Sequence, residues 1–259
     1  MIQYIREADL LERIRKIIND SPYDLRNYEG VGGTGGPGRL MEHLLGIDVN
    51  NVSAPDSVEY EIKTSMQTGS LVTLFHKEPG VSERGAISEL VRSFGWSPTR
   101  GNYPAGTLSF RHTVGSQPSD RGFQVRVENN RVRVDFESNN VVISEHENWL
   151  ADVQERCGSI WKNPPIWTHD ELSRTGSRKL PNCIYLKGKK TGSTVTFNEA
   201  TILRGFLPSE FFTGLREGFI LIDFDARTNA SGGIRNHGTK FRVRPQRFSS
   251  LYEKYSPAT

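Results

Sequence analysis

The first part of the chain shows two helical hydrophobic patterns separated by glycines. In residues 7–19 apolar side chains recur every three or four positions, which predicts an amphipathic helix. Residues 39–45 show the same spacing over a shorter stretch, and Gly46 directly after them predicts the end of a second helix. The glycine-rich residues 30–38 lie between these helices and predict a flexible loop.

A different period follows at residues 58–63, where apolar and charged residues alternate. A period of two predicts a strand with one buried face. Glu61 and Lys63 are expected to project from the same face, with Asp56 at the start of the strand. Residues 70–75 are predicted to be the hairpin partner of this strand.

The rest of the chain mixes both periods. Strong hairpin signals flank Asn129-Asn130, because asparagine tolerates the backbone that tight hairpin turns need. Helices are expected at residues 82–96, 145–156, from Asn198, from Ser209 and at 247–255, strands at 107–114, 123–127, 132–136, 183–187, 193–197, 219–225 and 240–244, and a loop at 159–182. These elements predict an α+β fold in which helices flank a mixed central sheet and a β-rich lobe is inserted or attached.

Composition narrows the class of protein. The chain has 259 residues, of which 35% are hydrophobic and 24% charged, as expected for a globular enzyme. No run of 18 apolar residues predicts a membrane span, and the N-terminus lacks the apolar core of a signal peptide. Two cysteines are too few for a disulfide framework, so a cytoplasmic location is expected.

Charge is unevenly distributed, although the net charge is only +3. Residues 173–190 and 226–247 each contain six basic residues and no acid. Concentrated lysine and arginine suit a polyanion, because they neutralise phosphates and release counterions. The alternative is that both segments are ordinary solvated loops.

Asp56, Glu61 and Lys63 form the candidate chemical site. Two carboxylates beside an ammonium suit a hard cation such as Mg²⁺, which can polarise a phosphoryl oxygen and activate water. The pattern Asp-x4-Glu-x-Lys therefore predicts metal-dependent phosphodiester cleavage, the alternative being an exposed strand face with a Glu/Lys pair. The glycine loop lacks the Gly-Lys-Ser/Thr ending of a phosphate loop, and we expect it to bring Glu42 near the metal site unless Glu42 is a surface acid. The six histidines lack zinc-site spacing, so a catalytic zinc is not expected.

A second group of candidates could contact DNA. Arginine and lysine can contact guanine, and asparagine can contact adenine, in the major groove. The late glycine-bearing segment has the candidates Arg227, Asn229, Arg235, His237, Lys240, Arg242 and Arg244. The alternative is that this segment is a mobile basic loop that contacts only phosphates. Arg242 and Arg244 are expected on one face of a strand. His76 and Lys77, directly after residues 70–75, are further candidates. Their alternative is a structural or solvated role for His76 and a surface charge for Lys77.

Four motifs together carry a family resemblance. They are Gly35-Gly36-Pro37-Gly38-Arg39-Leu40-Met41-Glu42-His43-Leu44-Leu45-Gly46-Ile47, the Pro55-Asp56-x4-Glu61-x-Lys63-Thr64 pattern, Leu74-Phe75-His76-Lys77-Glu78-Pro79, and His237-Gly238-Thr239-Lys240-Phe241-Arg242. They resemble the MvaI/BcnI-type restriction endonucleases, which are relatives of the mismatch-repair nickase MutH. The motifs match within about residues 30–80 and 219–244.

The resemblance implies a PD-(D/E)xK core, Mg²⁺, double-stranded DNA as the substrate and a monomer with two lobes. It implies a catalytic lobe at about residues 1–160 and a recognition lobe at about 161–245. Asp56, Glu61 and Lys63 would be the catalytic set, with Glu42 as an accessory acid. His76 and His237 would contact bases.

The sequence thus predicts a type II restriction endonuclease that leaves 5′-phosphate and 3′-hydroxyl ends. Asp56, Glu61 and the carbonyl of Ile62 are expected to hold Mg²⁺. Lys63 is expected to orient or help deprotonate the attacking water. The alternatives are a MutH-like nicking enzyme and a DNA-binding protein that does not cleave.

Overall fold

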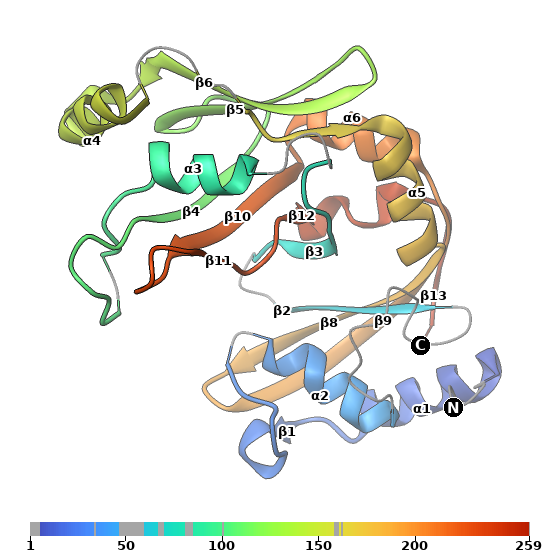
Figure 1. The fold of residues 1–259 in the computed structure, drawn as a ribbon. Coiled ribbons are helices and arrows are strands. Elements are labelled where there is room, and N and C mark those ends of the chain that lie inside the picture. Colours follow the sequence, from blue (N-terminus) through green and yellow to red (C-terminus); the bar gives the residue numbers. More distant parts are fainter. Residues whose placement is uncertain are drawn as a thin grey trace. The chain divides into compact units, whose positions relative to one another are not determined.

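The computed structural model describes residues 6–33, 35–46, 60–66, 70–80, 85–99, 101–157, 161 and 163–258. Within them the helices are α1 (Glu7–Asn19), α2 (Gly36–Leu45), α3 (Ala86–Phe94), α4 (Ile143–Cys157), α5 (His169–Lys179) and α6 (Pro208–Glu217), with 3₁₀ turns η1 (Leu25–Asn27), η3 (Pro245–Arg247) and η4 (Ser249–Leu251). The expected α+β class is confirmed (Figure 1).

The strands form three sheets. The first has the order β1-β9-β8-β2, with β13 also paired to β9, the second has the order β11-β10-β12-β3, with β4 on β10, and the third is β5-β6-β7. The strands are β1 (Tyr23–Asp24), β2 (Glu61–Met66), β3 (Val72–His76), β4 (Ser109–Val114), β5 (Arg121–Glu128), β6 (Arg131–Val141), β7 (Ile166–Thr168), β8 (Asn182–Thr191), β9 (Thr194–Phe206), β10 (Ile220–Thr228), β11 (Ile234–Asn236), β12 (Lys240–Val243) and β13 (Tyr252–Pro257).

The chain divides into two compact units. Unit 1 comprises Met1–Val72, Arg174–Glu210 and Val243–Thr259, and unit 2 comprises Thr73–Ser173 and Phe211–Arg242. The units are interleaved along the sequence, so they do not coincide with lobes at about 1–160 and 161–245. A division into catalytic and recognition lobes stays a prediction.

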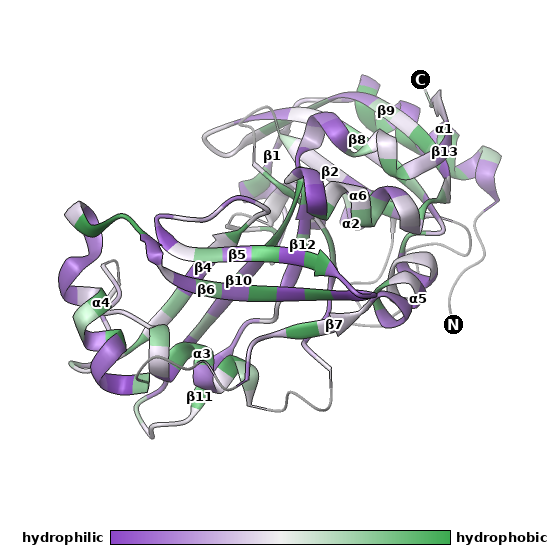
Figure 2. Ribbon diagram, turned by 90° about the horizontal axis from the view of Figure 1, so that it is seen from above, coloured by the Kyte–Doolittle hydropathy of each residue, from purple (hydrophilic) through white to green (hydrophobic). Residues whose placement is uncertain are grey.

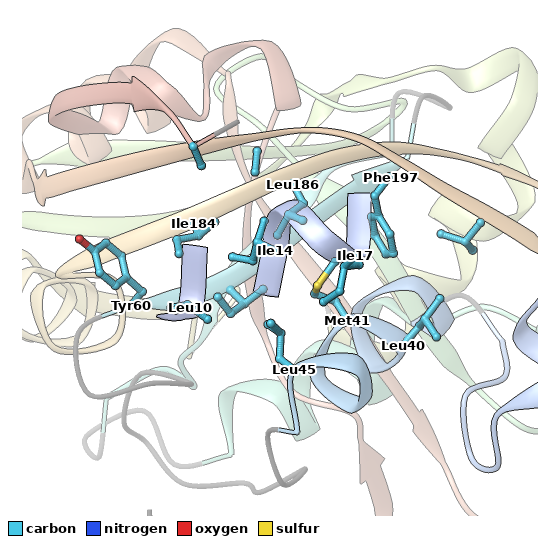
Figure 3. Close-up of a cluster of buried hydrophobic side chains, with 14 of the residues drawn as sticks. Leu10, Ile14, Ile17, Leu40, Met41, Leu45, Tyr60, Ile184, Leu186 and Phe197 are labelled. Carbon is cyan, nitrogen blue, oxygen red and sulfur yellow. The ribbon is translucent and has the colours of Figure 1, made fainter. Parts of the chain in front are cut away.

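Unit 1 is built on one hydrophobic core. Helices α1 and α2 cover one face of the sheet that contains β2, β8 and β9 (Figure 1). Apolar side chains from both helices meet alternating residues of the strands in this core (Figure 3). Its fully or nearly buried members include Leu10, Ile14, Leu40, Met41, Leu45, Tyr60, Ile62, Ile184, Leu186 and Phe197. The predicted helices at 7–19 and 39–45 are confirmed, and Gly46 adopts φ 71°, the left-handed conformation of a glycine C-cap.

Unit 2 contains the predicted hairpin. Asn129 and Asn130 adopt φ angles of 49° and 59° between β5 and β6, so a tight turn with two left-handed residues joins these strands. Hydrophilic and hydrophobic residues alternate along both strands (Figure 2). This alternation follows from the two-residue period of strands and gives the third sheet one apolar face.

The predicted hairpin between residues 58–63 and 70–75 is wrong. β2 pairs in parallel with β8, from Glu61↔Cys183 to Met66↔Gly188, and β3 lies beside β12 in the second sheet. An alternating pattern predicts that a strand forms but does not specify its partner. Parallel partners come from distant parts of the chain, because they need a long crossover connection.

Three further predictions are wrong. Residues 159–182 contain β7 and α5, where Thr168 and Glu171 form reciprocal side chain–backbone hydrogen bonds of 3.2 Å, a capping box that marks the start of a helix. The helix expected from Asn198 is part of β9, and the one expected at 247–255 is two 3₁₀ turns followed by β13. β8 and β13 both pair with β9, and these ladders outweigh local helix preference.

Candidate active site

Glu61 and Lys63, the described members of the predicted catalytic set, lie together on one face of β2. The Nζ atom of Lys63 lies 2.5 Å from Oε1 of Glu61, and the side chains are 18% and 15% exposed. Ile62, between them, points into the core of unit 1. The structure therefore shows the shared face that the alternation predicts. Asp56 lies outside the described residues, and the catalytic roles of all three stay predictions.

A buried cysteine and a buried tyrosine lie near Glu61 in the first sheet. In the parallel register Glu61 lies beside Cys183 of β8, which is fully buried. Burial raises the pKa of Tyr252 well above its usual range, and the neighbouring Cys183 and Glu61 raise this pKa further. Tyr252 therefore stays protonated and uncharged, so it adds no negative charge beside the Glu61 carboxylate.

A hydrogen-bonded group anchors the start of β2. The hydroxyl of Tyr60 donates to Oε2 of Glu7 at 2.6 Å and accepts from Nε of Arg204 at 3.1 Å. Arg204 also donates to Oε1 of Glu7 at 2.7 Å. Burial and the Glu7 hydrogen bond raise the pKa of Tyr60 to about 12, so its hydroxyl keeps its proton. The group ties α1 and β9 to the residue immediately before Glu61.

Glu42 lies on the helix that packs beside this strand. A Cβ atom built at Gly38 would lie 3.6 Å from Oγ1 of Thr64, so α2 approaches β2 directly after Lys63. Glu42 is one helical turn beyond Gly38 and therefore lies on the same side of α2, where it is half-buried. This placement favours the accessory role that was predicted for Glu42, which stays a prediction.

In unit 2, the late motif is held against the segment that follows β3. Glu78 accepts hydrogen bonds from the backbone N of Thr239 at 2.8 Å and from its hydroxyl at 3.0 Å. The backbone N of Lys77 donates to the carbonyl of Thr239 at 3.0 Å. Thr239 is 1% exposed, so its donors depend on Glu78. We call Glu78 and Thr239 the Glu78 clasp.

The clasp brings two predicted DNA-contacting residues close together. Gly238 adopts φ +90°, and a Cβ atom built there would lie 2.7 Å from Nδ1 of His76. Glycine therefore leaves the space that the His76 ring occupies. His237 precedes this glycine and is exposed, as is His76 at the end of β3. The motifs that contain His76 and His237 are far apart in the sequence, and they thus meet at one place in unit 2.

Lys240 and Arg242 lie on one face of the second sheet, opposite acids of β10. The Nζ atom of Lys240 lies 3.8 Å from carboxylate oxygens of both Asp223 and Asp225, and Arg242 lies 3.2 Å from Asp223. Arg111 of β4 contacts Asp225 at 2.9 Å. We call these five residues the β10–β12 charged face. Its acids come from β10, so the acid-free segment is partly neutralised in the folded chain.

The remaining candidates of the late segment have different surroundings. The guanidinium of Arg227 lies over the ring of Tyr103 at 4.8 Å, and the Asn229 side chain accepts from the backbone and hydroxyl of Ser231 within its turn. Both side chains thus have structural partners. Arg235 is exposed on β11, and Arg244 follows the last residue of β12 and does not share its strand with Arg242.

Residues 173–190 also differ from a simple solvated loop. They include much of α5 and β8. Lys187 contacts Glu199 at 2.5 Å, Lys190 donates to the carbonyl of Gly33 at 3.3 Å, and Lys189 is exposed. Lys190 therefore connects β8 to the glycine-rich segment through Gly33.

Sequence analysis missed the residues that support these candidates. Glu78 stands inside the quoted histidine motif, but nothing local shows that its partner is Thr239, which lies 161 positions away. Asp223 and Asp225 alternate with apolar residues in a strand pattern, and that alternation could have marked them as one polar face.

Comparison with known proteins agrees with this geometry. The model of the MvaI/BcnI restriction endonuclease family matches residues 11–252. The chain belongs to this family. The protein is therefore a type II restriction endonuclease, and the predicted family and class of enzyme are confirmed.

Two solved structures of a restriction endonuclease resemble this family member in fold. The complex of restriction endonuclease MvaI with its cognate DNA has a TM-score of 0.76 and 21% identity, covering 98% of this chain and 100% of the other. MvaI in the absence of DNA has a TM-score of 0.56 and 22% identity, covering 99% and 100%. No curated protein sequence matched the chain. Across the part of the chain that the structure describes, no helix is long and apolar enough to cross a membrane.

Proposed function

We propose that this restriction endonuclease is an Mg²⁺-dependent enzyme that cleaves double-stranded DNA at a short specific site. The Glu61–Lys63 pair on β2 is the observation that carries the proposal, in a chain whose family is restriction endonucleases. The resemblance to the fold of MvaI, which has been solved with cognate DNA, supports double-stranded DNA as the substrate. We further propose that the protein acts as a monomer in the cytoplasm.

The donor set fits Mg²⁺. Asp56, Glu61 and the Ile62 carbonyl would provide oxygen ligands, which hard cations prefer. The Glu61 carboxylate contacts Lys63 through Oε1 and remains 15% exposed, so it is accessible to an ion. When bound, Mg²⁺ would polarise the scissile phosphate and lower the pKa of a bound water.

Lys63 would act on the nucleophile and on the phosphate. Its ammonium is held at 2.5 Å by Glu61, so its position is set before DNA binds. From there it would orient the attacking water, assist its deprotonation and offset negative charge on the phosphate. The bond to the 3′ oxygen would break, leaving a 5′-phosphate and a 3′-hydroxyl. Glu42, on the side of α2 toward β2, would assist as an accessory acid.

Recognition would depend on unit 2. His76 and His237 are exposed beside Gly238. Arg235 lies on β11, and Lys240 and Arg242 lie on β12, on the other side of β10 in the same sheet. These side chains would contact base edges, where good paired contacts discriminate by about 1–3 kcal/mol per base pair. Lys77, Arg227 and Asn229 would support or extend this surface, and Arg244, which belongs to unit 1, stays a separate candidate for DNA contact.

Cleavage of supercoiled phage or plasmid DNA tests the proposal. With Mg²⁺ or Mn²⁺ we expect linear products with fixed ends, which sequencing maps, whereas Ca²⁺ should support binding only, because its longer and looser bonds activate water less well. Open-circular product that never becomes linear would instead show a nicking enzyme. Full cleavage in excess EDTA would contradict the metal dependence.

A further inference from the structure

Three metal-ligating side chains converge in unit 2, where the connection between β4 and β5 meets the start of α4. The Nε2 atom of His146 lies 2.6 Å from Oδ2 of Asp120 and 3.9 Å from Oε2 of Glu145. One ligand atom from each residue lies within 4.8 Å of the others. We propose that Asp120, Glu145 and His146 bind one divalent transition-metal ion of the zinc type.

The ligand chemistry suits such an ion. An imidazole nitrogen and two carboxylate oxygens bind zinc at about 2.0–2.2 Å, so ligand atoms that share a tetrahedral ion lie about 3.3 Å apart. The two observed separations, 2.6 and 3.9 Å, lie on either side of this spacing. Asp120 and Glu145 are 46% and 63% exposed, so small rotations of their side chains can adjust both distances. This exposure also lets an ion enter from solvent.

A second histidine lies near the same carboxylate. The Nε2 atom of His112 lies 2.8 Å from the hydroxyl of Ser119 and 3.9 Å from Oδ1 of Asp120. His112 thus links β4 to the β4–β5 connection that carries Asp120.

The charges around Asp120, Glu145 and His146 (the trio) favour a bound cation. The guanidinium of Arg121 is a nearby positive group, and it lies over the rings of Trp96 and Trp149 at 4.2 and 4.6 Å. Asp120 and Glu145 contribute two negative charges against this one. The negative charges would attract an ion, and an ion bound to Asp120, Glu145 and His146 would connect the β4–β5 turn to α4. This would stabilise unit 2, because only the folded chain assembles the ligands.

Metal binding to the full-length protein tests the proposal. The Asp56→Asn/Glu61→Gln double variant is the starting protein, so that the proposed catalytic ligands are removed. We expect one equivalent of Zn²⁺ by competition with a chromogenic chelator, visible absorption bands when Co²⁺ replaces it, and a higher melting temperature with Zn²⁺. Adding His146→Ala should abolish all three responses.

A matched pair of acids makes the test decisive even if His146→Ala fails to fold. Glu145→Gln should weaken Zn²⁺ binding at least tenfold, whereas Glu147→Gln, which changes an exposed acid outside the trio on the same helix, should leave it unchanged. Equal affinities for these two variants would overturn the proposal. So would the absence of stoichiometric Zn²⁺ binding, which would show that the contact between Asp120 and His146 serves only the fold.

Discussion

Two groups of opposite charges in this protein are built in different ways. On β2, Glu61 and Lys63 are two positions apart and contact each other at 2.5 Å. On the β10–β12 charged face, Lys240 and Arg242 face acids of another strand at 3.2–3.8 Å. The first contact forms whenever its strand forms, whereas the second requires correct strand pairing. The geometry of the Glu61–Lys63 pair is therefore local, and the candidate recognition geometry is tertiary.

The largest expected effect concerns the local pair. Lys63→Ala or Glu61→Gln should abolish cleavage, a loss of at least about 10²–10⁴-fold, because the water and the phosphate lose their positioned group. Specific DNA binding should remain, since most binding contacts are made to the DNA backbone elsewhere. Single-turnover cleavage and gel shifts in Ca²⁺ measure the two effects.

A control comes from the neighbouring strand. Lys187 forms an ion pair of the same length with Glu199, but both side chains are about half exposed. Lys187→Ala should therefore keep cleavage within a small factor of the unaltered enzyme. Cleavage by Lys63→Ala at the unaltered rate would end the catalytic assignment of Lys63.

The next largest effect distinguishes side chains that contact bases from side chains that contact only phosphates. His237→Ala and Arg242→Ala should weaken cognate binding by about 1–3 kcal/mol and relax preference at one base pair. Arg174→Ala and Lys189→Ala should weaken all sequences alike and lower the salt slope by about one unit. Binding to a cognate duplex and its single-base variants at several salt concentrations distinguishes these patterns. If His237→Ala and Arg242→Ala weaken binding to cognate DNA and to random DNA by the same factor, the late segment contacts only phosphates.

A third effect tests whether the tertiary clasp supports recognition. Glu78→Ala leaves the buried donors of Thr239 unpaired, which should cost about 1–3 kcal/mol of unfolding free energy and reduce base discrimination. Urea unfolding and the same set of duplexes measure both. Thr239→Ser keeps the hydroxyl that Glu78 accepts from and should resemble the unaltered protein more closely than Thr239→Val. A Glu78→Ala protein with full discrimination would show that the clasp does not position His237.

The smallest effect tests the anchor of the local pair. Tyr60→Phe removes the hydroxyl between Glu7 and Arg204 and should cost about 1 kcal/mol of unfolding free energy. The pKa of Tyr60 is raised to about 12, so its hydrogen bonds stabilise the fold fully below the usual pKa of 10 and are lost as pH rises toward 12.

The dependence of the cleavage rate on pH should therefore be the same for Tyr60→Phe and the unaltered enzyme between about pH 6 and 9, since Tyr60 does not titrate there. Tyr255→Phe, which alters a 72% exposed tyrosine, is the matched control for stability. A shifted profile for Tyr60→Phe alone would mean that the anchor positions Glu61 during catalysis.

Sequence patterns predicted the parts of the fold that depend on neighbouring residues. They include the first two helices, the glycine end of α2, the hairpin turn at Asn129-Asn130 and the common face of Glu61 and Lys63. Each depends on a period, a cap or a turn within a few residues. The partner of β2 and the strand character of β13 and of β9 from Asn198 onward could not be predicted, because pairing between distant strands outweighs local preference.

The sequence by itself determined the chemistry that is available on β2 and, through its four motifs, the family. Only the tertiary structure decided which distant groups meet. It placed Glu78 on Thr239, His76 beside Gly238, and His146 against Asp120. The physical reason is that a strand or helix orients its own side chains by its period, whereas contacts across the chain depend on how whole elements bury their apolar faces.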